Sequence, residues 1–429
     1  MLIKEKMKNL EKEDKVGIQA ELEQARQAKC TMASMSNADR QEVLKKIASS
    51  LLINKQRIIQ ENQKDLAKLD DKDPKRDRLL LDEPRIEQMA SSILEVSKLD
   101  DPTGQLLLER ELPNGLLVRK ETVALGVIAV IYESRPNVTI DVASLCLRSA
   151  NICLLRGGSD AWYSNSCLVE ILKEVLVSAG CNPHLVQLLP VEREYVEELL
   201  HARSYVDLII PRGSQSLINY VREHAKVPVI ETGAGVCHTY VDETADLDMA
   251  ANIIANAKIS RPSVCNALDT ILVDALVLNG LLERLAPKFE SAKVEVLADA
   301  ISYPVWKSFA YQHLGKATED YFGREFLDLI CSMKVVNGLE EALEHIAHYS
   351  SKHSECIVSQ NPKNIATFMK MVDAAAVYAN ASTRFTDGGV FGLGAEIGIS
   401  TQKLHARGPF ALEKLVCEKW FINGQGQIR

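Results

Sequence analysis

The spacing of apolar residues over residues 17–100 is helical. Val43, Ile47 and Leu51 recur near the 3.6-residue period, and charged residues occupy the positions between them. This pattern predicts helices throughout the segment. It stops at D-P-T-G (101–104), where proline and glycine interrupt the period.

Two apolar runs follow, and they flank Pro113-Asn114-Gly115. Asn-Gly between apolar runs is a strong hairpin signal, because both residues tolerate the positive φ of a tight turn. The sequence therefore predicts a hairpin within 105–125 that projects from the body and meets a partner subunit. The tail, Val416–Ile422, predicts a last strand.

From Thr122 onward, short apolar runs alternate with helical patterns, which predicts a parallel sheet covered on both faces, a doubly wound α/β domain. A second α/β region follows Asp242 and extends to about residue 381. The predicted elements of the first region are the strand Ile152–Leu155 and the helices Cys167–Val177, Glu192–Ala202 and Leu217–Ala225.

Two strand-to-helix turns contain glycine, Arg156-Gly157-Gly158-Ser159 and Arg212-Gly213-Ser214. Glycine lets backbone N–H groups approach a ligand, and a helix N-terminus favours an anion, so the pair is consistent with a nucleotide clamp. Two ordinary βα turns are the alternative. A third glycine run, Gly392-x-Gly394-x-x-x-Gly398, follows no clear strand and has the wrong last interval for a dinucleotide fingerprint.

Composition narrows the functional class. A length of 429 residues predicts two or three domains, and a net charge of −8 argues against a general nucleic-acid binder. The longest apolar stretch, Val123–Tyr132, is too short to span a bilayer, and residues 1–15 lack the apolar core of a secretory signal. Ten cysteines without a C-x-x-C pair indicate reduced thiols in the cytoplasm. His345 and His348 lack a third ligand nearby, so we expect no metal.

One cysteine stands at the junction of a loop and a strand. Cys265 lies in N-A-K-I-S-R-P-S-V-C-N-A-L-D-T (256–270), directly before a β-like run. Lys258 and Arg261 would favour its thiolate if they point toward it. From local features alone, a small buried core residue is the alternative.

Several blocks of the chain together resemble the aldehyde dehydrogenase superfamily and, within it, the γ-glutamyl phosphate reductase (glutamate-5-semialdehyde dehydrogenase) family. The resemblance covers nearly the full length, and its last two blocks are long and specific to this reductase. The blocks are G-V-I-A-V-I-Y-E-S-R-P-N-V-T (126–139), L-R-G-G-S-D-A (155–161), P-R-G-S (211–214), A-K-I-S-R-P-S-V-C-N-A-L-D-T (257–270), H-S-E-C-I-V (353–358), N-A-S-T-R-F-T-D-G-G (380–389) and the stretch 391–409.

The resemblance implies an α/β, aldehyde dehydrogenase-like fold of three parts. A Rossmann-type dinucleotide-binding domain is expected at 1–104 and 126–250. An α/β catalytic domain carrying the nucleophilic cysteine is expected at 251–400. A small β oligomerisation element is expected at 105–125 and 401–429, which implies a homodimer or a higher homo-oligomer.

The resemblance also implies a reaction, the NADPH-dependent reduction of L-glutamyl 5-phosphate to L-glutamate 5-semialdehyde with release of phosphate, a step of proline biosynthesis. Cys265 matches the family nucleophile that forms a thioester. Two oxyanions arise on this path, and the candidate donors to them are the backbone N–H of Cys265 or Asn266 and the side-chain amide of Asn137.

Further site residues follow from the same resemblance. For the cofactor, NADP(H), these are Arg156, Gly213 and Ser214, together with Glu325 for the nicotinamide ribose. Arginine suits the phosphate and carboxylate of the substrate, and structural ion pairing is the alternative for each arginine. The substrate-binding candidates are Arg135, Ser382, Thr383 and Arg384, with Arg407 a weaker one.

Glu231, in E-T-G-A-G, stands where hydrolytic aldehyde dehydrogenases carry the glutamate that activates water. An acyl-phosphate reductase does not need that water, so we expect Glu231 not to be a required base. The alternatives are a hydrolytic aldehyde dehydrogenase acting on another aldehyde and a non-catalytic scaffold of the same fold. The reductase half of a bifunctional synthase is a third reading, against which the initiating methionine argues. A glutamate kinase is an expected transient partner; no nucleic acid or membrane is expected.

Overall fold

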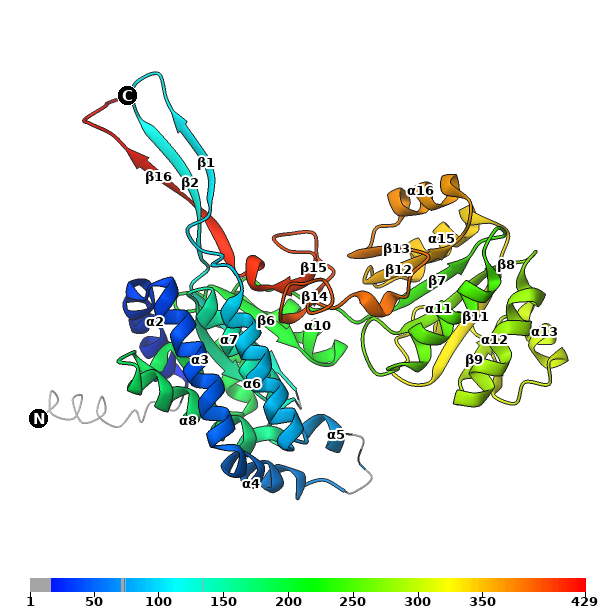
Figure 1. Cartoon of the computed structure of the whole chain (residues 1–429), viewed down its shortest axis with the longest axis horizontal. Helices are drawn as coiled ribbons and strands as arrows, with labels where there is room; N and C mark the ends of the chain where they lie inside the picture. Colours follow the sequence, from blue (N-terminus) through cyan, green and yellow to red (C-terminus); the bar gives the residue numbers. More distant parts are fainter. Residues whose placement is uncertain (1–16, 71–72, 74, 134) are drawn as a thin grey trace, which may run out of the picture. The chain divides into compact units, whose positions relative to one another are not determined.

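The computed structural model describes residues 17–70, 73, 75–133 and 135–429. Residues 1–15, which argued against a secretory signal, lie outside the described part. The chain forms two compact units (Figure 1). Unit 1 comprises Met1–Glu231, Leu393–Gly398 and Phe410–Arg429, and unit 2 comprises Thr232–Gly392 and Ile399–Pro409.

Unit 1 begins with a layer of helices, and the helical prediction for the described part of 17–100 is confirmed. Val43, Ile47 and Leu51 are all buried on one of these helices, α3. That helix starts with a reciprocal capping box, in which the Ser36 side chain accepts from the Asp39 N–H and the Asp39 carboxylate accepts from the Ser36 N–H. The helices are α2 (Gln19–Ser34), α3 (Asn37–Ile53), α4 (Lys55–Leu66), α5 (Lys75–Leu79) and α6 (Glu83–Lys98).

A four-stranded parallel sheet lies at the centre of unit 1, in the order β5-β4-β3-β6. In chain order this is 3-2-1-4, so successive strands run outward in one direction and then reverse at the junction of β3 and β6. Ligands of doubly wound sheets bind outside the strand ends at such a junction. The elements are β3 (Val127–Tyr132), α7 (Pro136–Arg148), β4 (Ile152–Arg156), α8 (Trp162–Ser178), β5 (Val186–Leu188), α9 (Arg193–His201), β6 (Leu208–Arg212) and α10 (Gln215–His224).

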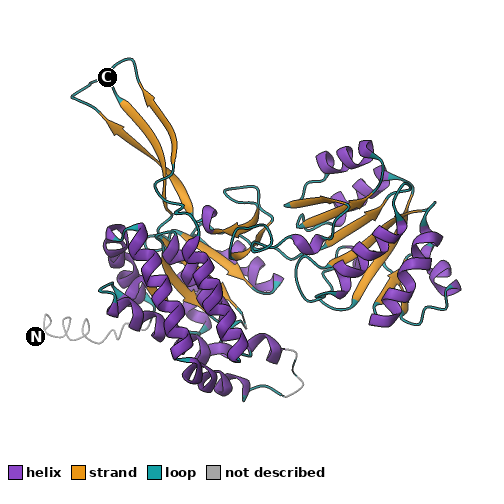
Figure 2. Ribbon diagram, viewed as in Figure 1, coloured by secondary structure: helices purple, strands orange, loops and turns teal. Residues whose placement is uncertain are grey.

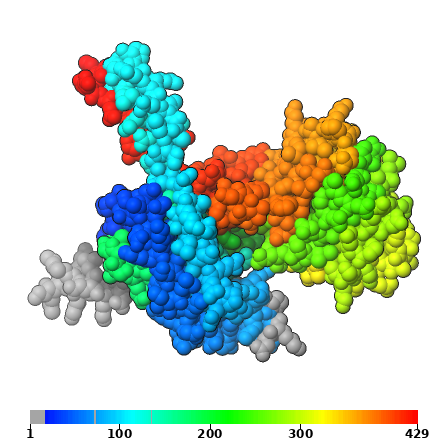
Figure 3. All heavy atoms as spheres, in the orientation of Figure 1, coloured from blue at the N-terminus to red at the C-terminus, as the bar shows by residue number. Residues whose placement is uncertain are grey.

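The predicted hairpin and the tail strand form one antiparallel sheet, which we call the arm. Strands β1 (Leu106–Glu111) and β2 (Leu117–Ala124) pair with each other, and β16 (Val416–Asn423) pairs with β2. The turn requires glycine at 115, where φ is +81°. In Figure 3 the cyan atoms of β1 and β2 lie against the red atoms of β16. The arm exposes apolar side chains, among them Trp420 and Ile422.

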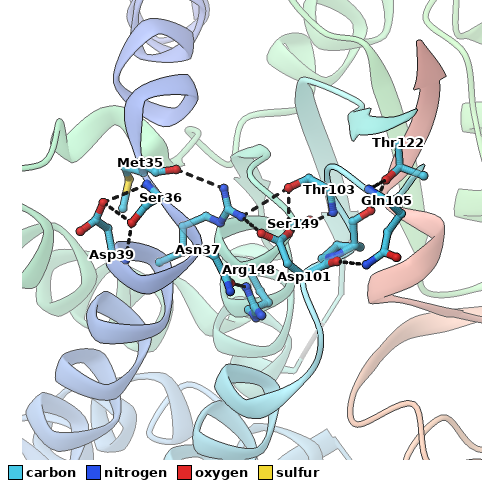
Figure 4. A network of polar contacts seen from close by, with 12 residues as sticks. Met35, Ser36, Asn37, Asp39, Asp101, Thr103, Gln105, Thr122, Arg148 and Ser149 are labelled. Carbon is cyan, nitrogen blue, oxygen red and sulfur yellow. Dashed lines mark hydrogen bonds and ion pairs between the residues drawn. The ribbon is translucent and has the colours of Figure 1, made fainter. Parts of the chain in front are cut away.

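Buried arginines anchor the base of the arm to the helical layer (Figure 4). Arg40 of α3 pairs with Asp101 and donates to the Met35 carbonyl. The Asp101 carboxylate also accepts from the Thr103 hydroxyl at 2.8 Å, at the start of the arm. Arg148 of α7 donates to the Asn37 side chain at 2.6 Å. These contacts engage the terminal nitrogens of two buried guanidinium groups, whereas the Nε of each has no hydrogen-bond partner in the described residues.

Unit 2 is built on a seven-stranded parallel sheet in the order β10-β9-β11-β8-β7-β12-β13. Successive residues of β8 face opposite sides: Ile271 and Val273 join one apolar cluster with α11, α12 and α13, and Leu272 joins another with α15 and α16. Helices therefore cover both faces, as Figure 2 shows, and the second predicted α/β region is confirmed.

The elements of unit 2 are β7 (Cys237–Val241), α11 (Leu247–Ile259), β8 (Leu268–Asp274), α12 (Leu278–Ala292), β9 (Glu295–Ala298), α13 (Ser302–Ser308), β10 (Leu314–Lys316), α14 (Glu319–Phe322), β11 (Ile330–Val336), α15 (Leu339–Tyr349), β12 (Ser354–Val358), α16 (Pro362–Met371) and β13 (Ala376–Ala379). Two further strands, β14 (Glu396–Ser400) and β15 (Gly408–Ala411), pair with each other.

The boundary between the units differs from the expected one. Residues 232–250, expected in the dinucleotide-binding part, belong to unit 2, because β7 pairs with β8 and β12. Residues 393–398 lie in unit 1 and 401–409 in unit 2, although we expected them in the catalytic domain and the oligomerisation element. Long-range strand pairing decides these assignments, and a local apolar pattern does not contain it. No helix in the described residues is long and apolar enough to cross a membrane.

Candidate active site

Cys265 lies in the loop that joins α11 to β8, and its side chain is partly exposed. All ten cysteines fall in the described part of the chain, and none forms a disulfide. Six of the others are buried, including Cys237, whose thiol donates to the Cys265 carbonyl at a sulfur–oxygen distance of 3.3 Å. Burial holds the pKa of the Cys237 thiol well above its usual value. Cys237 is therefore an inert thiol that supports the Cys265 loop.

Gly235 packs directly against the backbone of Cys265. A Cβ at position 235 would lie 1.4 Å from the Cys265 carbonyl oxygen, so only glycine fits. The Gly235 N–H donates to Glu325 Oε1 at 2.8 Å. Glu325, predicted to bind the nicotinamide ribose, thus contacts the strip of backbone that lies behind Cys265. Burial raises its pKa.

The structure brings Asn266 together with the predicted substrate-binding segment 382–384. The Asn266 side-chain amide donates to the carbonyls of Arg384 and Thr386, and the Asn266 carbonyl accepts from the Thr383 hydroxyl at 2.8 Å. Ser382 is buried and accepts the Arg384 N–H. The Asn266 amide and the Thr383 hydroxyl therefore hold the two loops to each other, and the Ser382 hydroxyl caps its own turn.

Arg384 places a positive charge beside the thiol loop. Its guanidinium donates to the Asn266 side-chain oxygen and, from Nε, to the Ser260 hydroxyl at 3.2 Å. Burial, with Arg261 nearby, lowers the pKa of Arg384. Two guanidinium groups therefore lie at this end of the sheet, where a polyanion would be favoured.

Lys258 does not serve as the thiolate's cation. The side chain is fully buried, its Nζ lies 3.8 Å from Asp269 Oδ1 and donates to the Asp328 carbonyl at 3.0 Å, and Asp269 is 2% exposed. Asp269 Oδ1 also accepts the Phe326 N–H at 3.0 Å. Burial raises the pKa of Asp269 to about 7 against the opposing influence of Lys258.

A chain of buried hydroxyl groups supports the loops from behind. The Ser354 hydroxyl contacts His353 Nδ1 at 2.8 Å and the Thr386 hydroxyl at 2.7 Å, and Thr386 contacts the Tyr378 hydroxyl at 2.7 Å. Burial lowers the pKa of His353 to about 4, so its imidazole is neutral near pH 7. The described residues contain no group of three His, Cys, Asp or Glu side chains that could hold a metal ion.

In unit 1, Gly213 and Ser214 form the turn between β6 and α10, at the junction where the strand order reverses. The Glu133 carboxylate, just after β3, occupies this turn: it accepts the Ser214 N–H at 2.8 Å and the Ser214 hydroxyl at 3.1 Å. A Cβ at position 213 would lie 2.5 Å from Glu133 Oε2. The turn is therefore already arranged to hold an anion, and its own chain supplies one.

The other glycine turn is packed with protein side chains. A Cβ at Gly157 would lie 2.3 Å from the Asn165 amide nitrogen, so the glycine is needed for packing rather than for a ligand. Arg156 ends β4 and donates to the Val191 carbonyl. Burial lowers the pKa of Arg156, and Arg193 at the start of α9 acts in the same direction. Two arginines thus meet at the carboxyl edge of the sheet.

The remaining candidates have these surroundings. Asn137 in the first turn of α7 donates to Asp141 at 3.2 Å, and Arg135 precedes that helix. Glu231 is the last residue before unit 2 and lies 3.5 Å from Arg222. Arg407 pairs with Asp373 at 2.7 Å, which favours a structural role for it.

The glycine run 392–398 begins in a turn and ends inside β14, with no helix directly after it, so it lacks the strand–turn–helix context of a dinucleotide fingerprint. Sequence reasoning missed Glu133, Gly235 and Asp269. The only sequence signal for Gly235 was its place in E-T-G-A-G. Asp269 was visible in C-N-A-L-D-T, four residues after the cysteine, but its partners come from a helix, a strand and a loop elsewhere in the chain.

Known proteins agree with this architecture. The aldehyde dehydrogenase family model matches residues 3–321. The γ-glutamyl phosphate reductase of Chlorobium phaeobacteroides is 51% identical over 413 residues, which cover 96% of this chain and 99% of that protein. The enzyme of that name from Bacteroides fragilis is 52% identical over 389 residues, covering 90% and 94%.

Solved structures extend the agreement to three dimensions. The crystal structure of γ-glutamyl phosphate reductase from Thermotoga maritima matches with a TM-score of 0.91 and 39% identity, covering 96% of this chain and 99% of that chain. An acetylating aldehyde dehydrogenase from Geobacillus thermoglucosidasius matches at a TM-score of 0.69 with 16% identity, which shows a shared fold. Identity of this extent over nearly the whole length places the chain in the γ-glutamyl phosphate reductase family, within the aldehyde dehydrogenase family.

Proposed function

We propose that the protein reduces L-glutamyl 5-phosphate to L-glutamate 5-semialdehyde and phosphate, with NADPH as reductant and Cys265 as the covalent nucleophile. The observation that carries the proposal is the arrangement around Cys265: a partly exposed thiol on a backbone fixed by Gly235, with Arg384 joined to the neighbouring Asn266. Homologues about half identical to the chain carry the name of this activity.

In the first step, the Cys265 thiolate attacks the γ-acyl carbon. A sulfur–carbon bond forms, the carbon–oxygen bond to phosphate breaks, and phosphate leaves with the bonding pair. Arg384, with Arg261 beside it, offsets the charge of the departing phosphate. Arg135 is retained as a further substrate-binding candidate. Ser382 and Thr383 contribute by holding the loop that carries Arg384.

The tetrahedral oxyanions need N–H donors in fixed positions. The backbone N–H groups of Cys265 and Asn266 belong to a loop tied down on both sides, so they require no rearrangement when charge develops. The side-chain amide of Asn266 is engaged by two carbonyls, which leaves its backbone as the candidate donor. Asn137 remains a proposed second donor.

The residues at the β3–β6 junction fit a dinucleotide. The N-terminus of α10 already receives a carboxylate from Glu133 as a stand-in anion, and Arg156 and Arg193 lie at the same edge of the sheet, where a 2′-phosphate would be paired. Gly213 and Ser214 would receive the pyrophosphate, and Glu325 would contact the ribose. These residues would hold a dihydronicotinamide cofactor, which would supply the hydride for the acyl carbon of the thioester. Cys265 is then released as thiolate when the aldehyde leaves.

Assembly and location belong to the same proposal. The exposed apolar residues of the arm support a homodimer or higher homo-oligomer, in which the arm is the surface that contacts the second copy of the chain. A cytoplasmic location is proposed from the reduced cysteines. A transient glutamate kinase partner is proposed because glutamyl phosphate cyclises readily and would have to be passed on quickly. The roles of the dinucleotide-binding, catalytic and oligomerisation parts are proposed on the same basis.

The deciding experiment follows reduction of NADP or NAD during oxidation of glutamate-5-semialdehyde, with and without phosphate, in the wild type and in Cys265→Ser. We expect phosphate-dependent activity that prefers NADP and is lost in Cys265→Ser. Activity indifferent to phosphate would identify a hydrolytic aldehyde dehydrogenase. Unchanged turnover in Cys265→Ser would rule out the covalent mechanism.

A further inference from the structure

A buried ion pair lies beneath the segments that surround Cys265. Lys258, in the last turn of α11, and Asp269, in β8, stand on opposite sides of the thiol in the sequence. The Lys258 side chain is fully buried and Asp269 is 2% exposed. A substrate or cofactor therefore does not touch either side chain, and the proposed chemistry uses neither.

Asp269 holds two other segments to the thiol loop. Its Oδ1 accepts the Phe326 N–H at 3.0 Å and its Oδ2 accepts the Cys237 N–H at 3.4 Å. Phe326 follows Glu325, whose carboxylate binds the Gly235 N–H, and Cys237 donates its thiol to the Cys265 carbonyl. The contacts close a ring from Asp269 through Glu325 and Gly235 to Cys265, and back through Cys237.

Lys258 fixes the carboxylate and a fourth segment. Its ammonium lies 3.8 Å from Asp269 Oδ1 and donates to the Asp328 carbonyl at 3.0 Å. The charged and titratable groups that interact with Asp269 are Lys258 of α11, Glu325 of the loop before β11, and the thiols of Cys237 in β7 and Cys331 in β11. The Asp269 carboxylate therefore accepts two backbone N–H groups and faces a cation, and the Lys258 ammonium binds a carbonyl of a further segment.

We propose that Lys258 and Asp269 are positioning residues that set the place of the Cys265 backbone relative to Gly235 and Glu325. This inference rests on the proposed function only for its kinetic readout. Proteins often keep their stability when apolar residues replace a buried ion pair. We therefore expect the Asp269 carboxylate, which accepts two N–H groups, to matter chiefly for the position of the segments that it holds. A displacement of about 1 Å at a reacting group lowers turnover by about a hundredfold.

The test compares four variants: Asp269→Asn, Lys258→Met, the double variant Lys258→Met/Asp269→Leu, and the control Asp242→Asn. Asp242 is buried and accepts hydrogen bonds from Thr244, Ser359 and Asn364. It follows β7 directly, at the opposite end of the strand from Cys237, about 16 Å away. Asp242 is therefore as buried and as well hydrogen-bonded as Asp269, but its hydrogen bonds do not lead to the Cys265 loop.

Three measurements are made: the thermal midpoint, kcat and KM for phosphate-dependent NADP reduction, and the pH profile of iodoacetamide alkylation at Cys265 followed by peptide mass spectrometry. We expect Asp269→Asn and Lys258→Met to lower kcat at least about tenfold with KM values within about threefold, and to shift the midpoint of the alkylation profile. Asp242→Asn should lose thermal stability and keep kcat and the alkylation profile within about twofold.

The double variant separates positioning from stability. The apolar pair removes the unpaired charge of each single variant but cannot accept the Phe326 and Cys237 N–H groups. We therefore expect a thermal midpoint above those of the single variants and below wild type, with kcat still low. Recovery of kcat together with stability, or folded single variants with wild-type kcat and an unshifted alkylation profile, would overturn the inference. A wild type without phosphate-dependent activity would instead overturn the proposed function, while the alkylation profiles, which need no substrate, would still decide the role of the pair.

Discussion

At the scale of single residues, two glycines in predicted loops have different reasons to be glycine. Gly213 makes room for a carboxylate, and Gly235 makes room for the backbone of the nucleophile's own residue. The sequence motifs placed both glycines near candidate site residues, but only the three-dimensional structure distinguishes Gly213, which meets a movable side chain, from Gly235, which meets fixed backbone. We therefore expect substitution of Gly235 to be harmful, and substitution of the carboxylate beside Gly213 to be tolerated.

Gly235→Ala should be strongly harmful. The added methyl group would overlap the Cys265 carbonyl, and because backbone cannot rotate away, we expect a loss of about 1–3 kcal/mol of stability and about a hundredfold of kcat. Urea unfolding and steady-state kinetics measure both. Gly323→Ala is the control, since its Cβ would meet Tyr349 at an ordinary 3.5 Å. A Gly235→Ala enzyme as active as that control would contradict the close approach.

Glu133→Gln should strengthen NADPH binding. The carboxylate occupies the N-terminus of α10 and would repel or compete with the cofactor's phosphates. Charge–dipole effects of about 0.3–1 kcal/mol correspond to a Kd lower by about twofold to fivefold, measured by fluorescence titration of NADPH. Ser214→Ala, which removes a donor from the same turn, should raise the Kd. Weaker binding by Glu133→Gln would show that the carboxylate assists the cofactor.

Glu231→Gln tests the expectation that no water-activating base is required. Glu231 lies beside Arg222, and its replacement should leave phosphate-dependent oxidation of the semialdehyde near the wild-type rate. Steady-state kinetics with saturating phosphate measure it. A fall of several orders of magnitude would make Glu231 a catalytic base after all.

At the scale of elements, local signals predicted most of the helices and strands. The arm's turn was visible because Asn-Gly carries its own conformational preference, and the parallel strands were visible as apolar runs. Glu133 was not recognised because its partner, Ser214, is set by strand order: β3 and β6 are neighbours across eighty residues of chain. The unit boundary at 231/232 differs from the expected domain boundary for the same reason, since β7 belongs to unit 2 by its pairing with β8.

Helix α15 should make stability depend on acid. His345 is buried against Phe322 and Tyr349, with His238, Lys334 and His348 nearby, and burial lowers its pKa to about 3. In the unfolded chain the pKa of His345 is near 6.5, so the unfolded state takes up the proton first as pH falls. The free energy of unfolding is therefore unaffected by His345 above about pH 6.5 and falls by about 1.4 kcal/mol per pH unit between about pH 6.5 and 3.

His345→Phe removes that titration. Among the described residues neither ring nitrogen has a hydrogen-bond partner, so phenylalanine replaces the ring without stranding a polar group. The free energy of unfolding, measured with urea between pH 7 and pH 5, should change less steeply with pH in His345→Phe than in wild type. The difference in slope should correspond to about one bound proton. His348→Phe, on the exposed side of the same helix, is the control for the added ring. Equal slopes in wild type and His345→Phe would contradict the neutral buried histidine.

At the scale of the whole molecule, the arm is the feature that packing within the chain leaves unexplained. Trp420 and Ile422 of β16 are 52% and 56% exposed, and Leu106 of β1 is 56% exposed, on a sheet of only three strands. Apolar residues on a small sheet lack the burial that normally stabilises strands, and we propose that a second copy of the chain covers them. The proposed symmetric assembly through this sheet would explain why the exposed apolar residues of the hairpin do not pack into a core of their own chain.

Ile422→Lys, combined with Leu106→Glu, should therefore lower the molecular mass in sedimentation velocity to that of a smaller species, because charges placed in an apolar interface lack paired partners. Leu276→Lys is the matched control: that leucine is 78% exposed in unit 2, and its replacement should leave the mass unchanged. If the arm variant keeps the wild-type mass at micromolar concentration, assembly does not use the arm. If all three proteins are monomers, the exposed residues of the arm need another partner, and the proposed homo-oligomer is wrong.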